Sequence, residues 1–191
     1  MAEVLLFHHA LGLTAGCRAF ADELRAVGHV VHTPDLFEGR TFGSVPEGVR
    51  HAEQLGFDTV TERGMRAAEA LPARIVLAGF SLGVMPAQRL AQTRPGAAGA
   101  LLVHGSVPLP EFGGTWPDGV PLQIHTMADD ELGDVDVAHE LVAAVAGAQL
   151  HLYPGEGHLF TDPGSPDHDP EAAALVMRRA LAFLHVADRR G

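Results

Sequence analysis

One five-residue stretch, Gly79-Phe80-Ser81-Leu82-Gly83, constrains the fold of this chain more than any other. It is a G-x-S-x-G pattern that follows an apolar run at 75–78 and precedes a helical pattern at 82–93. A serine on a sharp turn between a buried strand and a helix needs neighbours without a Cβ atom, because the turn crowds the strand against the helix. Pro86 fits this arrangement, since proline is tolerated in the first turn of a helix but not in its interior. We therefore predict a nucleophile elbow that projects the Ser81 hydroxyl outward.

An ordinary glycine-rich turn is the alternative, and the order of the neighbouring segments argues against it. Short apolar runs alternate with longer segments of helical periodicity along the chain. The predicted strands are residues 4–7, 30–32, 75–78, 100–103, 122–125 and 150–153. The predicted helices are residues 17–27, 59–71, 82–93, 135–146 and 170–186. This alternation predicts an α/β fold with a mostly parallel sheet of about six strands and helices on both faces.

Length favours a single domain over residues 1–191, because 191 residues with 47% hydrophobic content can bury one substantial core. Residues 36–56 are the least regular part. They are consistent with short helical turns above the carboxyl edge of the sheet, where open α/β sheets bind their ligands.

Charged residues exclude several classes of function. The chain has 24 acidic and 13 basic residues, for a net charge of −11, and every basic residue is arginine. The absence of lysine rules out Schiff-base chemistry and a P-loop lysine, which both require an ε-amino group. The acidic balance argues against a nucleic-acid partner, and no apolar run approaches the length that spans a membrane.

Cysteine usage and the N-terminal residues indicate a cytoplasmic protein. Cys17 is the only cysteine, so no internal disulfide or cysteine-based zinc cluster can form. The apolar run at 4–7 is too short for a signal peptide, and no basic residue precedes it. We expect Cys17 to be a small buried residue rather than a reactive thiol at a helix start.

A functional elbow requires a histidine base and a carboxylate that orients it, because a serine hydroxyl is a poor nucleophile at neutral pH. On this type of sheet the acid follows the serine in the chain and the histidine follows the acid. His158 fits best among the 12 histidines, because it lies in a glycine-containing loop after the last predicted strand. His168, farther along the same acidic loop, is the reserve candidate.

The acid is expected in the loop after the predicted strand at 122–125, where Asp129, Asp130 and Glu131 are adjacent. We choose Asp130, with Asp129 as the second choice. A purely structural acidic turn, or a helix cap, is the alternative for these carboxylates.

Acyl transfer also needs N–H donors that point at the developing oxyanion. The backbone N–H of Leu82 is one expected donor, and a backbone N–H near His9 or Ala10 in the first-strand loop is the other, with His9 chosen. The His8-His9 pair could suggest a metal ion, but adjacent strand residues point to opposite faces. We expect neither a metal site nor a cofactor.

With these residues assembled, the chain resembles the dienelactone hydrolase family of α/β-hydrolases over nearly its whole length. The shared stretches are Leu11-Gly12-Leu13, Thr33-Pro34-Asp35-Leu36-Phe37, the elbow, and Tyr153-Pro154-Gly155 to His158-Leu159-Phe160. The resemblance implies a single-domain hydrolase without a large lid, with Ser81, Asp130 and His158 at the matching positions.

Two departures from the family pattern concern the nucleophile. The best-known members carry a cysteine at the position of Ser81 and a glutamate at the position of His9, and those two residues work together. Their replacement here suggests a conventional serine mechanism. The arginines that hold the substrate carboxylate in that subgroup have no clear counterpart, although Arg40 lies in a plausible loop.

Hydrolysis of a small ester or lactone through an acyl-enzyme on Ser81 is the leading hypothesis, with a small-molecule substrate. A catalytically silent protein of the same fold that binds a ligand or partner is one alternative. Acyl transfer or perhydrolysis on the same three residues is another. The sequence leaves open whether the protein is a monomer or a homodimer.

Overall fold

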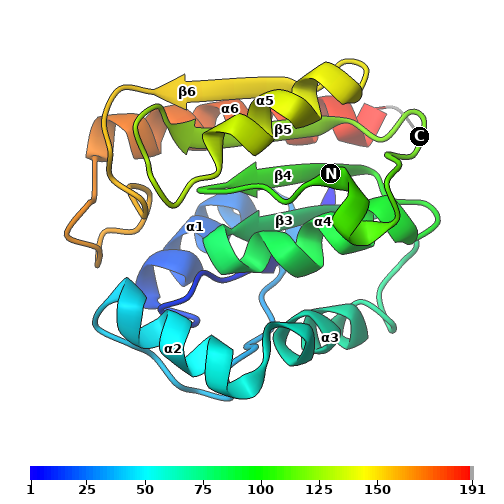
Figure 1. The fold of residues 1–191 in the computed structure, drawn as a ribbon. Helices are drawn as coiled ribbons and strands as arrows, with labels where there is room; N and C mark the ends of the chain where they lie inside the picture. Colours follow the sequence, from blue (N-terminus) through cyan, green and yellow to red (C-terminus); the bar gives the residue numbers. More distant parts are fainter. Residues whose placement is uncertain (190–191) are drawn as a thin grey trace.

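Six parallel strands form one sheet at the centre of the molecule (Figure 1). The computed structural model describes residues 1–189. The strands are β1 Glu3–Phe7, β2 Val30–His32, β3 Val76–Phe80, β4 Gly99–Val103, β5 Leu122–Met127 and β6 Gln149–Tyr153. They are arranged in the order β2-β1-β3-β4-β5-β6, and all five pairings are parallel. The predicted parallel sheet of about six strands is confirmed.

Helices cover both faces of this sheet, as predicted. They are α1 Ala15–Ala26, α2 Val45–Leu55, α3 Phe57–Ala67, α4 Val84–Thr93, α5 Val135–Ala144 and α6 Pro170–Arg189. In Figure 1, α4 and α5 lie in front of the sheet, while α1 and α6 lie behind it. Val4 and Leu6 of β1 share a core with α1 and α6, whereas Leu5 and Phe7 share a core with α3, α4 and α5. This division follows from the alternation of side chains along a strand.

The strand register brings the functional loops to one edge. Phe7 of β1 pairs with Gly79 of β3, and Phe80 of β3 pairs with Val103 of β4. Because all strands run in the same direction, the loops that follow β1, β3, β4, β5 and β6 leave the sheet at its carboxyl edge. The residues predicted to act together are therefore placed on neighbouring loops.

The segment between β2 and β3 differs from the prediction. Instead of short turns it contains α2, a helix of 11 residues, and α3 then begins at Phe57, two residues before the predicted start. The buried residues of α2 are Gly48 and Ala52, and a Cβ at Gly48 would overlap the carbonyl of Ala10. The apolar residues of α2, namely Val45, Val49, Ala52 and Leu55, do recur at helical spacing, so the sequence contains a helical pattern here. Pro46 and Gly48 within the first turns, which lower helix propensity, obscure that pattern.

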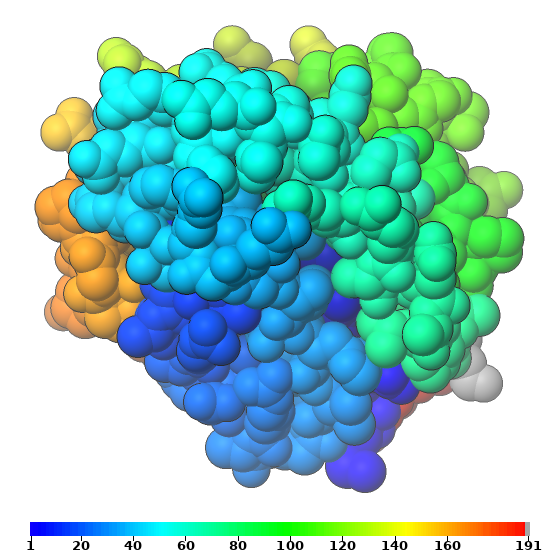
Figure 2. Space-filling view, turned by 90° about the horizontal axis from the view of Figure 1, so that it is seen from below, coloured from blue at the N-terminus to red at the C-terminus, as the bar shows by residue number. Residues whose placement is uncertain are grey.

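The α2–α3 pair covers one side of the molecule. Seen from below, the residues of α2 and α3, in cyan and teal, form one continuous surface (Figure 2). No helix within residues 1–189 is long and apolar enough to cross a membrane.

Candidate active site

Ser81 lies at the junction between β3 and α4. A single 3₁₀ turn, Ser81–Gly83, joins the two elements, and Ser81 has a φ of 47°, in the left-handed region that side chains rarely adopt. A Cβ at Gly79 would overlap the carbonyl of Gly83, and a Cβ at Gly83 would lie 2.5 Å from the Phe7 carbonyl oxygen. Both glycines of the motif are thus required by close approach, and the backbone strain is concentrated at the serine.

A chain of hydrogen bonds connects Ser81 to His158 and Asp130. The Ser81 Oγ lies 2.7 Å from His158 Nε2, and His158 Nδ1 lies 2.8 Å from Asp130 Oδ2. Asp130 is 5% exposed and His158 is 7% exposed, so both are shielded from water. A neutral His158 that donates from Nδ1 to the carboxylate leaves Nε2 free to accept the Ser81 hydroxyl proton.

The loop after β5 distinguishes the two adjacent aspartates. The second carboxylate oxygen of Asp130 accepts the Leu132 N–H at 2.9 Å, which fixes its orientation toward His158. Asp129 is exposed, and its backbone N–H donates to the Gly155 carbonyl at 3.0 Å. The structure therefore brings Asp130, rather than Asp129, to the histidine. His168 lines a different hollow, beside α1 and α6.

The first-strand loop lies directly against the elbow. The position where Gly83 would carry a Cβ is 2.7 Å from the His8 carbonyl oxygen. Leu82 and Ala10 both line the hollow that contains Ser81 and His158. This placement suits Leu82 as an oxyanion donor and favours Ala10 over His9 for the second one. His9 as that donor stays a prediction.

The hollow beside Ser81 has a volume of about 480 Å³ and is mainly apolar. Its walls come from α2, α3, α4, α5 and the loop after β4. Val45 and Val49 of α2 and Phe57 of α3 belong to it, so the segment that the sequence left unresolved supplies one wall. A hollow of this size suits a small organic ligand.

His104 directly follows β4 and lies close to His158, and it was not identified from the sequence. It is fully buried, its ring centroid is 6.1 Å from that of His158, and its φ is 66°. Its Nε2 lies 2.7 Å from the Thr161 hydroxyl, whereas no described residue pairs with its Nδ1. Burial holds the pKa of His104 well below its usual value, so the ring is neutral.

His8 and His9 point to different surroundings, as expected for adjacent residues at a strand end. His8 Nδ1 donates to the His9 carbonyl at 2.8 Å, and its Nε2 accepts the Leu36 N–H at 2.9 Å. Burial lowers the pKa of His8 to about 4, which agrees with the neutral ring that these bonds require. His8 thereby ties the first-strand loop to the loop after β2.

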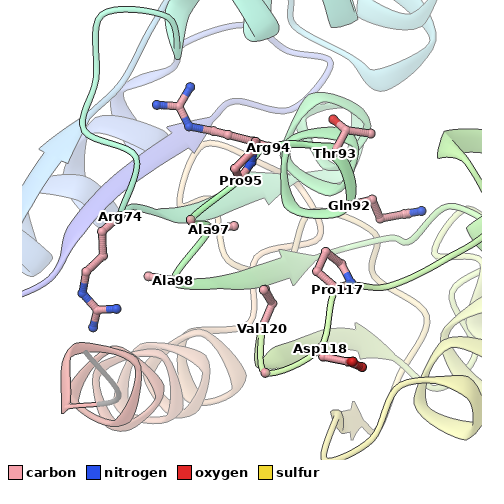
Figure 3. A pocket seen from close by; sticks show the side chains of 12 residues that line it. Arg74, Gln92, Thr93, Arg94, Pro95, Ala97, Ala98, Pro117, Asp118 and Val120 are labelled. Carbon is pink, nitrogen blue, oxygen red and sulfur yellow. The ribbon is translucent and has the colours of Figure 1, made fainter.

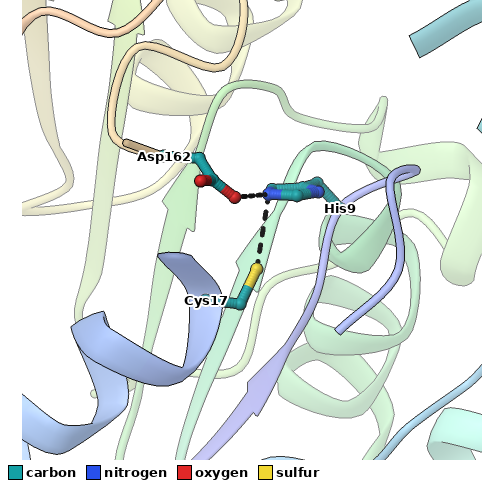
Figure 4. Close-up of side chains that lie close together, drawn as sticks. All are labelled: His9, Cys17 and Asp162. Atoms are coloured by element: carbon teal, nitrogen blue, oxygen red, sulfur yellow. Dashed lines mark hydrogen bonds and ion pairs between the residues drawn. The ribbon is translucent and has the colours of Figure 1, made fainter. Parts of the chain in front are cut away.

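The His9 side chain turns instead to the loop that carries His158 (Figure 4). Its Nε2 lies 2.7 Å from Asp162 Oδ2 and 3.3 Å from Cys17 Sγ. Asp162 also accepts the Thr14 hydroxyl at 2.6 Å and the Gly164 N–H at 2.7 Å. We call His9, Cys17 and Asp162 the buried cluster, since each is at most 3% exposed.

Charge holds the buried cluster together. Burial opposes protonation of His9, but its hydrogen bonds to Asp162 and Cys17 outweigh burial and raise its pKa to about 9. Burial likewise opposes ionisation of Asp162, but its hydrogen bonds to His9 and Thr14 lower its pKa to about 2. The Leu11 N–H, 3.3 Å from Nδ1, favours a neutral ring, and this long contact is weaker than the short charge-assisted bond.

The buried cluster also contains three kinds of metal ligand. One atom from each residue lies within 4.8 Å of the others. From the sequence, His9 was considered as a metal ligand only together with His8. Cys17 and Asp162 were not identified as possible ligands, because the fold brings them to His9 and no sequence spacing connects them. The expectation of no metal site stays a prediction.

A second hollow, of about 460 Å³, lies at the opposite, amino edge of the sheet (Figure 3). It is bordered by Arg74 and Arg94, whose guanidinium groups point apart in Figure 3. Arg74 donates to the Ala187 carbonyl at 2.6 Å, and Arg94 donates to the Leu71 carbonyl at 2.7 Å. Both arginines thus brace chain segments, and this hollow contains none of the three predicted catalytic residues.

The parallel sheet, the elbow after β3, and the acid and histidine after β5 and β6 define an α/β-hydrolase fold. The model of the dienelactone hydrolase family matches residues 1–187. The chain belongs to the dienelactone hydrolase family, as the sequence resemblance indicated, and this membership supports its assignment as an ester-bond hydrolase.

One curated protein resembles part of the chain. A curated protein of Azospirillum brasilense, provisionally named a carboxymethylenebutenolidase, is 35% identical over 66 residues, which span 33% of this chain and 29% of that protein.

Two solved structures match the whole fold. One is a dienelactone hydrolase-like promiscuous phosphotriesterase, P91, from metagenomic libraries, with a TM-score of 0.76 and 19% identity over 99% of this chain and 86% of its own. A dienelactone hydrolase from Anabaena variabilis has a TM-score of 0.70 and 17% identity over 97% of this chain and 86% of its own.

Proposed function

We propose that the protein is a serine hydrolase that cleaves small carboxylic esters or lactones through an acyl-enzyme on Ser81. The observation that carries the proposal is the chain of hydrogen bonds from Ser81 through His158 to the buried Asp130. Ser81 and His158 also line an apolar hollow. Membership of the dienelactone hydrolase family supports the same reaction class.

In the first half of the reaction, the Ser81 hydroxyl passes its proton to His158 Nε2 as its oxygen bonds to the substrate carbonyl carbon. The carbonyl π electrons move to the oxygen, which the Leu82 N–H stabilises. Collapse of this intermediate breaks the bond to the leaving oxygen, which takes the proton from His158. Asp130 keeps the imidazole oriented and stabilises the imidazolium form.

In the second half, a water molecule gives a proton to His158 and adds to the acyl carbon. Collapse then breaks the bond to Ser81, whose oxygen recovers the proton from His158, and the carboxylic acid leaves. Every proton passes between Ser81 or His158 and the leaving oxygen or water, so the proposed steps use no cofactor.

The test is hydrolysis of a panel of short-chain p-nitrophenyl esters and small lactones by the wild type, Ser81→Ala and Ser106→Ala. Ser106 is a matched control, because it lines the same hollow but is not hydrogen-bonded to His158 in the structure. We expect Ser81→Ala alone to abolish turnover. Equal activity of wild type and Ser81→Ala would overturn the proposal, and a folded wild type that hydrolyses no member would favour the silent ligand-binding alternative.

A further inference from the structure

We propose that the hollow beside Ser81 selects esters with an apolar acyl group and no negative charge, and that Asp134 and Glu111 at its rim reject carboxylate-bearing substrates. This inference rests on the proposed serine hydrolase function and specifies its substrate class. It also separates this chain from hydrolases that hold an anionic lactone with arginines.

The first basis is the chemistry of the wall. Its apolar side chains come from five different parts of the chain and enclose the space next to the nucleophile. They include Val45, Val49, Phe57, Met85, Val107 and Val137. None of these groups can replace the water around a carboxylate, so burying a charged acyl chain here would be costly. An alkyl or aryl group of the substrate would instead gain from burial against them.

The second basis is the sign of the charges around the hollow. Apart from histidines, the charged residues within 1–189 that line it are Asp134 and Glu111, and none of the arginines in that part of the chain lines it. Arg40, the residue considered from the sequence as a carboxylate partner, is exposed and is not part of the lining. A substrate carboxylate would therefore meet two negative charges and no positive one.

The third basis is that neither rim carboxylate is engaged in a helix cap or an ion pair within residues 1–189. Asp134 occupies the N-cap position of α5, where an aspartate commonly binds the first N–H groups, yet its side chain makes no such bond. Neither Asp134 nor Glu111 forms an ion pair with a described residue. Their charge is not neutralised and acts on whatever enters the hollow.

The position of Asp134 is fixed by its backbone. Its φ is 49°, and its carbonyl accepts the Ser106 hydroxyl at 3.5 Å, which links it to the loop after β4. Desolvation raises the pKa of Asp134, His158 opposes this rise, and Asp130 adds to it. Asp134 is therefore close enough to His158 and Asp130 to interact with them electrostatically. A substrate carboxylate placed next to Asp134 would be repelled by its negative charge.

The experiment compares three p-nitrophenyl esters of similar length, namely the pentanoate, the hemisuccinate and the 4-(trimethylammonio)butanoate. The first is neutral at the far end of the acyl chain, the second is anionic and the third is cationic. We measure kcat/KM for wild type, Asp134→Asn, Glu111→Gln and the double variant. Asp118→Asn serves as a charge-matched control, because Asp118 is exposed and lines the hollow at the amino edge.

We expect the wild type to prefer the pentanoate over the hemisuccinate by at least about tenfold. Each rim substitution should narrow that ratio by about three- to tenfold, and the double variant should narrow it further. Asp118→Asn should leave the ratio unchanged. Raising the salt concentration should narrow the wild-type ratio, because the rim charges are exposed to solvent.

Two failures can be told apart with Ser81→Ala as the reference. Hydrolysis that persists in Ser81→Ala would overturn the proposed function itself. Ser81-dependent hydrolysis with the hemisuccinate turned over as fast as the pentanoate would overturn only the substrate class. A preference that the folded double variant retains in full would show that the two rim carboxylates do not set it.

Discussion

The pair formed by His9 and Asp162 should make a pH-dependent contribution to stability that one substitution removes. Asp162→Asn keeps the shape of the side chain but leaves the His9 imidazolium buried without a counter-ion. The pKa of His9 rises from 6.5 to about 9 in the folded protein, which corresponds to about 3 kcal/mol of stabilisation. The lowered pKa of Asp162 describes the same interaction, so the two shifts are not added.

The sign of each shift fixes the pH window. Because the pKa of His9 is raised to about 9 on folding, its contribution is complete below pH 6.5 and is lost as the pH rises through 9. Because the pKa of Asp162 is lowered to about 2, its contribution is present above pH 3.8 and is lost as the pH falls through 2. The pair therefore stabilises the protein most between about pH 4 and 6.5.

Thermal and urea unfolding of wild type and Asp162→Asn at pH 5.5 and pH 9.5 measure this contribution. For a chain of this size, about 3 kcal/mol corresponds to a loss of about 6–12 °C in Tm at pH 5.5. The loss should be clearly smaller at pH 9.5. Asp167→Asn is the control, since Asp167 is an exposed acid in the same loop. An equal loss at both pH values, or none at pH 5.5, would refute a charged His9–Asp162 pair.

Three further predictions concern the catalytic loops and the buried cluster. Asp130→Asn should lower kcat by about 10²- to 10⁴-fold, while Asp129→Asn should change it less than about threefold; esterase kinetics on the two variants decide between them, and the reverse order would place the acid one residue earlier. Gly83→Ala should lower the free energy of unfolding by about 1–3 kcal/mol, because its methyl group meets the Phe7 and His8 carbonyls; wild-type stability in urea unfolding would contradict that contact. Treatment with a chelator should leave activity and Tm unchanged, because hydrogen bonds already pair His9 with Asp162 and Cys17; a fall in Tm that Zn²⁺ reverses would show that the cluster holds a metal ion.

The sheet and the spacing of the site residues could be predicted because they depend on local patterns. An apolar run followed by glycines marks the end of β3, and chain order alone restricted the acid and the base to the loops after β5 and β6. The sequence does not distinguish Asp130 from Asp129 by chemistry, because the three adjacent side chains at 129–131 are all carboxylates. In the structure the distinction depends on the direction of one side chain, which the Leu132 N–H helps to fix.

Features created by long-range packing could not be predicted in the same way. The close approach of α2 to the first-strand loop requires Gly48, which packs against the Ala10 carbonyl and lowers the helix propensity of a segment that forms a wall of the hollow. Asp162 is separated from His9 by 153 positions, and no motif connects them. His104 belongs to no motif in the sequence, and only the fold places its ring beside that of His158.

The central claim is that Ser81 is a nucleophile activated by His158 and oriented for attack. Incubation of the folded protein with a fluorophosphonate probe, followed by peptide mass spectrometry, tests this most directly. We predict one covalent adduct per chain, located on Ser81, with labelling slowed strongly in His158→Ala and absent in Ser81→Ala. Labelling at another residue, or no adduct on folded wild-type protein even at raised pH, would contradict the account.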